Sequence, residues 1–206
     1  MSTIETIYNS FRGIKQHSID HTINFFETSP ISLSEFKSFK ERKDLKFFIE
    51  LTWQYTNALF QKHHYNETID KIILYFPIIE NEIERLGDNT LKDNWYYGIL
   101  FFQGMASHNL HDFKTATPIF KQLLLQDPKN DNYKDWYNSS LYGKRMRISK
   151  SIMIVCLTLF AIAILFHKYF PFNVKMSLEG IALLGLMATT IYDYYTKRSR
   201  RKNGIE

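Results

Sequence analysis

The residues best able to do chemistry are histidines, and the first two stand beside an aspartate near the start of the chain. His17 and His21 are four residues apart, with Asp20 between them. On a helix this spacing places both imidazoles on one face, where they could hold zinc if another ligand converged. The pair lacks the glutamate of a metalloprotease HExxH motif. A surface pair is the alternative, and we predict that the chain holds no metal.

The remaining candidates for catalysis stand at expected turns. His63 and His64 precede a helical stretch, and His108 and His111 flank another expected turn. We interpret all four as turn residues rather than as ligands or bases. Cys156 is the only cysteine, and the sequence contains no phosphate-binding glycine loop and no nucleophile elbow. These patterns favour a protein that is not an enzyme and that uses no cofactor.

Two carboxylates stand within long apolar stretches near the end of the sequence. The stretches cover residues 151–170 and 176–195, and each is long enough for a helix to cross roughly 30 Å of hydrocarbon. Glu179 and Asp193 lie in the second stretch. Carboxylates inside a membrane are candidates for proton or ion transfer, but both lie near an end of the stretch, where headgroups or water are within reach. We predict a transmembrane hairpin, in which Glu179 and Asp193 either reach headgroups and water or take part in proton or ion transfer.

Charge is divided unevenly along the chain. Residues 1–143 carry 15 basic and 18 acidic side chains, a net charge of −3, whereas residues 144–206 carry 11 and 3, a net charge of +8. The overall charge of +5 therefore belongs to the flanks of the apolar stretches and does not indicate nucleic-acid binding. Nine basic residues flank the two stretches on their outer sides and two lie between them. The positive-inside rule then predicts that both termini are cytoplasmic.

Residues 1–143 show helical periodicity and no alternating strand pattern. Ser2 with Glu5 and Ser32 with Glu35 are capping-box signatures, the second leading into a long helix, and Ser29–Pro30 interrupts the first helical pattern. Further helices are expected at residues 65–86, 94–109, 112–126 and 133–142.

The sequence predicts how the helix at residues 65–86 ends and which of its faces is solvated. Gly87 is an expected C-terminal cap, because glycine takes the left-handed conformation freely. The acidic cluster Glu80, Glu82 and Glu84 is expected on a solvated face. The fold class is therefore all-α, with a domain of six or seven helices at residues 1–143 and a membrane anchor at residues 144–206.

Residues 97–130 resemble one tetratricopeptide (TPR) repeat of 34 residues. The small and packing positions of the family fall on the following residues: Gly104, Phe113, Ala116, Phe120, Leu123 and Pro128. Leu100, Gln103 and Ser107 replace the usual tryptophan, leucine and aromatic residue. A weaker unit covers residues 49–86, begins 48 residues earlier, and places Thr56, Thr68 and Ile72 at small and packing sites.

The resemblance implies a TPR-like domain of helical hairpins that binds a peptide or a partner helix in a groove lined by the first helix of each unit. Carried over by position, the groove residues are Trp53, Asn57, Phe60, Gln61, Phe101, Met105, His108 and Asn109. The alternative is that the aromatic residues and the methionine among them are ordinary core residues. The family's carboxylate clamp has a lysine where this chain has Trp53, which disfavours an acidic C-terminal peptide as the partner.

Together these expectations predict a protein-interaction adaptor or assembly factor. A two-helix anchor would hold it at a membrane, with the domain facing the cytoplasm. The predicted membrane is a bacterial inner membrane, and an organelle surface is the alternative. Small residues in the apolar stretches would let the hairpin pack closely or form homo- or hetero-oligomers: Ala161, Ala163, Gly180, Gly185 and Ala188. The rival function is an accessory subunit of a transport, channel or secretion complex in which the hairpin is the working part.

Overall fold

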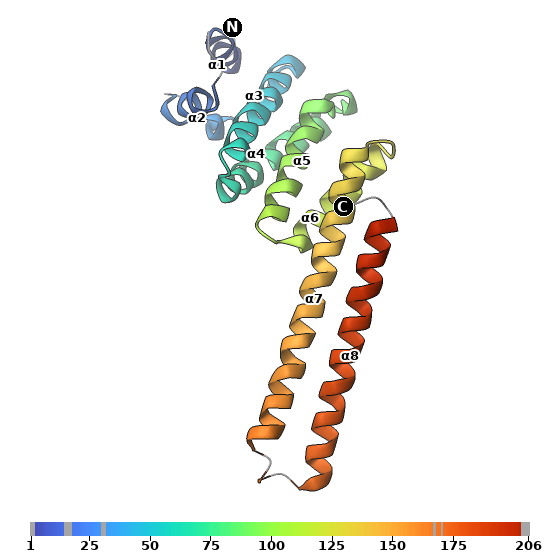
Figure 1. Ribbon diagram of the computed structural model, residues 1–206. Helices are drawn as coiled ribbons and strands as arrows, with labels where there is room; N and C mark the ends of the chain where they lie inside the picture. Colours follow the sequence, from blue (N-terminus) through green and yellow to red (C-terminus); the bar gives the residue numbers. More distant parts are fainter. Residues whose placement is uncertain (1–2, 15–17, 30–31, 167, 170, 203–206) are drawn as a thin grey trace. The chain divides into compact units, whose positions relative to one another are not determined.

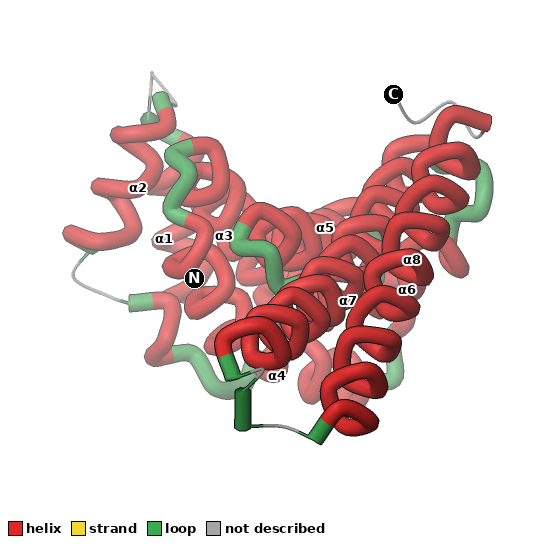
Figure 2. Tube along the Cα trace, turned by 60° about the horizontal axis from the view of Figure 1, so that its bottom comes forward, coloured by secondary structure: helices red, strands yellow, loops and turns green. Residues whose placement is uncertain are grey.

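The computed structural model of the protein describes residues 3–14, 18–29, 32–166, 168–169 and 171–202. Every regular element within these residues is a helix (Figures 1 and 2). The all-α prediction is therefore confirmed. The chain divides into two compact units, Met1–Lys134 and Asp135–Glu206. Ser2, His17 and Pro30, on which several expectations depended, lie outside the described residues.

The first unit contains two helical hairpins preceded by two shorter helices. Its helices are α1 (Thr3–Arg12), α2 (Ile19–Thr28), α3 (Arg42–Gln61), α4 (Tyr65–Leu86), α5 (Asn94–Asn109) and α6 (Phe113–Gln126), with short 3₁₀ helices η1 (Leu33–Glu35) and η2 (Asn89–Leu91). Helix α3 contacts α1, α2, α4 and α5, and α5 also contacts α4 and α6. The core of the unit therefore lies around α3 and α5.

Local sequence signals explain several helix ends. The Asp93 carboxylate accepts the backbone N–H of Trp95 at 3.0 Å and so caps the start of α5. The Asp112 carboxylate accepts the N–H of Thr115 at 3.4 Å at the start of α6. Helix α4 ends at Gly87, whose φ of 65° is left-handed, as predicted from its position.

The expected long helix after Ser32 is shorter than predicted. The Ser32–Glu35 capping box does form, but it caps only the 3₁₀ turn η1, and α3 begins at Arg42. Phe39, in the segment between them, is 4% exposed and its backbone is bound by side chains of α4. Contacts with a distant helix therefore replace the helical hydrogen bonds that the local sequence pattern favours.

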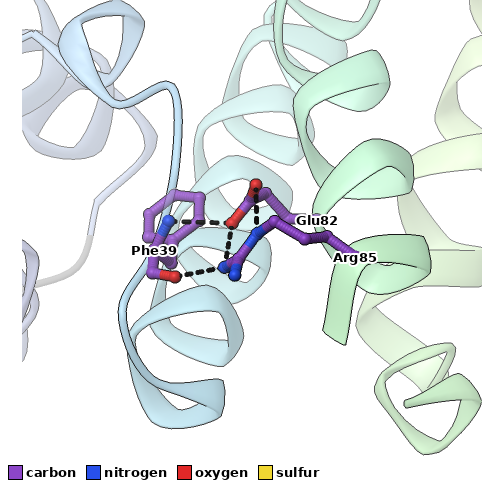
Figure 3. Close-up of polar contacts among 3 residues, drawn as sticks. All are labelled: Phe39, Glu82 and Arg85. Atoms are coloured by element: carbon purple, nitrogen blue, oxygen red, sulfur yellow. Dashed lines mark hydrogen bonds and ion pairs between the residues drawn. The ribbon is translucent and has the colours of Figure 1, made fainter. Parts of the chain in front are cut away.

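The side chain that holds this segment is Glu82, and the prediction that it lies on a solvated face is wrong. Glu82 is 5% exposed, and its Oε2 accepts the N–H of Phe39 at 2.8 Å (Figure 3). Arg85 forms an ion pair with Glu82, with Nη2 2.8 Å from Oε2 and Nε 3.0 Å from Oε1, and it also donates to the carbonyl of Phe39. These hydrogen bonds hold the pKa of Glu82 below its ordinary value although burial opposes them.

The second unit is dominated by two long helices. Helix α7 covers Asp131–Leu165, so the helix expected at residues 133–142 and the first apolar stretch form one continuous helix, and α8 covers Phe172–Lys202. Both are long and apolar enough to cross a membrane. Helix α7 ends five residues before the predicted end of its span at residue 170, and α8 begins four residues before residue 176.

The packing of α7 against α8 is the reverse of that in a water-soluble hairpin. Within the apolar part of the hairpin, the buried residues that the structure describes are small or polar and recur every seventh position, with Ser149, Cys156 and Ala163 on α7 and Ala182 and Thr189 on α8. A Cβ built on Gly185 would lie 2.3 Å from the Sγ of Cys156, so the helices approach closely there. The other small residues singled out in the sequence lie away from this contact. A Cβ built on Gly180 would have no neighbour within 4 Å, and Ala161 and Ala188 are exposed.

The large apolar side chains of this hairpin point outward. Among them, Ile154 is 61% exposed and Leu184 is 69% exposed, and similar residues follow both helices: Ile152, Val155, Leu157, Ile164, Leu165, Ile181, Leu183 and Met187. An apolar surface of this extent is costly in water and is typical of a surface that another apolar phase covers.

We predict that Glu82→Gln lowers the free energy of unfolding of the first unit by about 2 kcal/mol, because charge-assisted hydrogen bonds to Phe39 and Arg85 are lost. Denaturation of the full chain in a mild detergent, followed by tryptophan fluorescence, measures the change. Glu84→Gln is the matched control, because Glu84 is exposed on the same helix, and its effect should stay within about 0.5 kcal/mol. Equal effects of the two substitutions would contradict the assignment.

The same substitution should change the dependence of stability on pH. The pKa of Glu82 is lower in the folded state than its ordinary value of about 4.3, so its contribution to stability is complete above that value. The contribution is lost as the pH falls through the folded pKa. The difference between wild type and Glu82→Gln should therefore shrink on acidification and stay constant between pH values of about 6 and 8.

Candidate protein-binding surface

The two hairpins of the predicted repeats end their first helices in the same way. A histidine with a left-handed backbone conformation lies at each turn, His63 with φ 62° and His111 with φ 60°, and the two are 48 residues apart. Each donates its N–H to the carbonyl three residues earlier, and the next N–H reaches back five residues, to Leu59 in one turn and Ser107 in the other. This is the hydrogen-bond pattern of a Schellman motif. The 48-residue offset inferred from the sequence therefore also relates the two observed turns.

The predicted packing residues of the clearer unit lie between α5 and α6. Ala116, Phe120 and Leu123 are fully buried, and a Cβ on Gly104 would lie 2.9 Å from the Phe120 ring. Only glycine lets the two helices approach so closely at this point. Phe113 is half-buried at the start of α6, 5.2 Å from the His108 ring, whereas Pro128 is exposed after its end.

Trp53 is half-buried where α3 meets α5. Its ring lies 4.5 Å from that of Trp95 in an edge-on arrangement and 5.7 Å from that of Phe102. A Cβ built on Gly98 would lie 2.2 Å from the Nε1 of Trp53, so the indole occupies space that a larger residue at position 98 would fill. Trp53 thus joins the two hairpins and keeps part of its surface exposed.

Phe60 continues this row of aromatic side chains along α3. Its ring lies 5.6 Å from Phe102 and 5.4 Å from Tyr65. Beside it, Gln61 is exposed and donates from Nε2 to Asn57 Oδ1 at 2.9 Å. The four predicted groove residues of α3 therefore form one continuous, partly exposed surface of aromatic and amide groups.

The predicted groove residues of α5 are divided between surface and core. Phe101 is half-buried and lies 6.0 Å from Phe120 and 5.3 Å from Tyr133, whereas Met105 is only 7% exposed. His108 and Asn109 are half-buried near the end of the helix. Burial lowers the pKa of His108, so its imidazole is neutral near pH 7.

Three residues outside the predicted groove support this surface, of which Phe102 is buried and Trp95 and Tyr133 are half-buried. Trp95, Phe102 and Tyr133 each contact a predicted groove residue. Trp95 and Phe102 are seven residues apart, a spacing that returns to nearly the same face of a helix, and this signal was available in the sequence. Tyr133 belongs to the start of α7, and its contact with Phe101 depends on how the chain returns after α6.

The histidines that suggested metal chemistry are not gathered into a site within the described residues. Among those residues no group of three His, Cys, Asp or Glu side chains is placed to hold a metal ion. His63 Nδ1 lies 2.7 Å from the Tyr65 hydroxyl, and His64 Nδ1 lies 3.3 Å from Glu67, so both have partners at their turn. Asp20, next to His21, forms an ion pair with Lys62 at 2.6 Å.

No protein-family model matches this chain, and comparisons with curated proteins and with solved structures found no match either. The TPR assignment therefore stays a prediction that rests on the residues quoted for it.

We predict that Gly98→Ala displaces the Trp53 indole and lowers the free energy of unfolding by about 1–3 kcal/mol, the usual cost of overpacking. Alanine is otherwise the better helix former, so a purely local effect would have the opposite sign. Tryptophan fluorescence of the full chain reports both the displaced ring and the stability. Gly180→Ala is the control, because nothing lies within 4 Å of its added Cβ, and it should leave the emission unchanged.

Proposed function

We propose that this chain is a membrane-anchored protein-interaction module, without catalytic activity, that serves as an adaptor or assembly factor. The hairpin of α7 and α8 holds it in a bilayer, and the first unit binds a peptide or helix of a partner protein. Tethering raises the effective concentration of the partner at the membrane, so a micromolar affinity is sufficient for function.

The observation that carries the membrane part of the proposal is the reversed packing of α7 and α8. Small side chains such as Cys156, Ala163 and Ala182 fill the contact, and large apolar ones such as Ile154 and Leu184 face outward. Within lipid there is no hydrophobic drive to bury leucine, and close backbone packing stabilises helix pairs instead. In water the same arrangement would leave most of the apolar surface uncovered.

The charge distribution supports an orientation for this anchor. The basic flanks lie at the outer ends of the two apolar stretches, and the connection between the stretches carries few basic residues. The positive-inside rule then puts both termini and the first unit in the cytoplasm, with Tyr169 of the connection on the other side. A bacterial inner membrane is the membrane we propose.

The partly exposed aromatic and amide surface of α3 and α5 supports the binding part of the proposal. Aromatic anchors beside adaptable amide groups are typical of protein-binding surfaces. Trp53 and Phe60 supply such anchors, and Asn57 and Gln61 supply hydrogen-bonding groups next to them. Met105 is buried and contributes to the core instead.

One observation favours the alternative, an accessory subunit of a membrane transport, channel or secretion complex. The Oδ1 of Asp193 on α8 is buried and has no hydrogen-bond partner among the described residues. Unsatisfied carboxylate oxygens in a spanning helix are candidates for contact with an ion or with another membrane protein. Under this alternative the hairpin carries the function of the protein, and the first unit is an accessory cytoplasmic domain.

We predict that cysteine labelling reports cytoplasmic termini. In a Cys156→Ser background, a membrane-impermeant maleimide should label Tyr169→Cys on intact bacterial spheroplasts and should label Lys129→Cys only after lysis. Both positions are exposed, so access alone decides the result. Labelling of Lys129→Cys in intact spheroplasts would overturn the orientation, and release of the chain by alkaline extraction would overturn the anchor.

We also predict that the partner is bound by the first unit and not by the hairpin. A photo-crosslinking amino acid at Asn57 should give one discrete protein adduct, and the same probe at Leu125, which is 71% exposed on α6, should not. Exchange of residues 144–206 for an unrelated two-span anchor should leave the Asn57 adduct unchanged. Loss of the adduct on exchange would instead support the membrane-subunit alternative.

A further inference from the structure

A crevice of about 350 Å³ lies between α7 and α8, at the end of the hairpin near the basic flanks. Its walls are formed by Ile148, Ser149 and Ile152 on α7 and by Ala188, Thr189 and Tyr192 on α8. The volume falls at the lower end of the range for small-molecule sites, roughly 300–1,000 Å³. The crevice lies entirely within the second unit.

The closest approach of the two helices forms one end of this crevice. Gly185 also lines the crevice, and a Cβ there would lie 2.3 Å from the Sγ of Cys156. One to two turns nearer the basic flanks, the side chains of Ser149 and Ala188 are too small to fill the space between the helices. The crevice is therefore a consequence of small residues at consecutive turns of both helices.

The lining selects an apolar occupant. The hydroxyl of Thr189 donates to the carbonyl of Leu186 at 2.9 Å, so its polar atom is already satisfied within α8. Ile148, Ile152 and Ala188 present only carbon. Ser149 and Tyr192 add two further hydroxyl groups to walls that are otherwise carbon, so a polar ligand would recover few of the hydrogen bonds it makes in water, whereas a hydrocarbon chain loses none.

Two cations precede the lining residues of the crevice along α7. Lys144 and Arg145 lie one helical turn before Ile148 and Ser149, on the face that lines the crevice, and both are exposed. Lys150 and Arg198 are also exposed nearby on the two helices. Asp193 is the single carboxylate in the described residues of this end, and the cations outnumber it.

We propose that this crevice binds one acyl chain of an anionic phospholipid whose phosphate is held by Lys144 and Arg145. The inference rests on the membrane anchor proposed above. A basic cluster directly beside an apolar crevice at the cytoplasmic end of two spanning helices matches both parts of such a lipid. A neutral lipid, a partner helix or a second copy of the chain fits the apolar walls but leaves the cations unused.

The test uses the full chain in mild detergent and native mass spectrometry with added phosphatidylglycerol or phosphatidylcholine. The chain should retain phosphatidylglycerol in preference. Lys144→Gln with Arg145→Gln should weaken its binding about 25-fold, at roughly fivefold for each cation near the membrane surface. Inorganic phosphate should not compete, because it lacks the acyl chain.

Ala188→Phe fills the crevice from an exposed position and should abolish the preference while leaving the charges in place. Ala161→Phe is the matched control, since Ala161 is an exposed residue of α7 that does not line the crevice. Far-ultraviolet circular dichroism of both variants checks that the helices form. Unchanged phosphatidylglycerol binding by helical Ala188→Phe, or equal binding of the two lipids by wild type, would overturn the proposal.

Three outcomes separate this inference from the proposed function. A dimer that Ala188→Phe disrupts, with no lipid bound to wild type, would assign the crevice to a second copy and overturn the lipid site alone. Release of the chain from membranes by alkali would instead remove the anchor on which the lipid site depends. A chain that resists alkaline extraction but binds the two lipids equally would support the membrane anchor and overturn the lipid site.

Discussion

The burial of α3 is the constraint on which the first unit depends. This helix contacts four others, and its buried residues include two carboxylates, Asp44 and Glu50, as well as aromatic and aliphatic side chains. Glu50 accepts hydrogen bonds from the Tyr8 hydroxyl at 3.0 Å and from Arg12 at 2.6 Å, both on α1. A buried carboxylate without partners is costly, so α1 stabilises α3 by supplying the donors for Glu50. The hairpins of this unit therefore depend on one another as helical repeats do.

The second unit buries small and polar side chains and exposes large apolar ones, which is the opposite of the first unit. The first unit buries Phe48, Leu51 and Phe120, whereas the hairpin buries Ser149 and Ala163 and exposes its isoleucines and leucines. Both patterns are consistent with one principle, that each surface matches the phase around it. Water covers the charged faces of the first unit, and under the proposed function lipid covers the hairpin. The change of pattern falls within α7, whose early residues are polar and whose later residues are apolar.

Signals that act over a few residues were readable from the sequence, and those that depend on a distant partner were not. Periodicity and caps predicted α5, α6 and the end of α4 at Gly87 closely. Glu82 was misplaced because its partner, the backbone of Phe39, is 43 residues away. The same contact ends the helical pattern after Ser32. The groove assignment also depended on tertiary packing, because helical spacing alone does not distinguish an exposed aromatic face from one shared with a neighbouring helix.

The proposed binding surface uses side chains that also hold the hairpins together. Trp53 is fixed against Trp95 and Gly98, so little of its rotamer freedom remains to be lost when a partner binds. Ordered aromatic anchors of this kind favour affinity, but they also couple binding to folding. A partner that contacts both α3 and α5 binds only their packed arrangement, and it therefore stabilises that arrangement by mass action. Under the proposed function, specificity then comes from the amide groups beside the rings, the half-buried Asn57 and the exposed Gln61, whose side chains bond to each other.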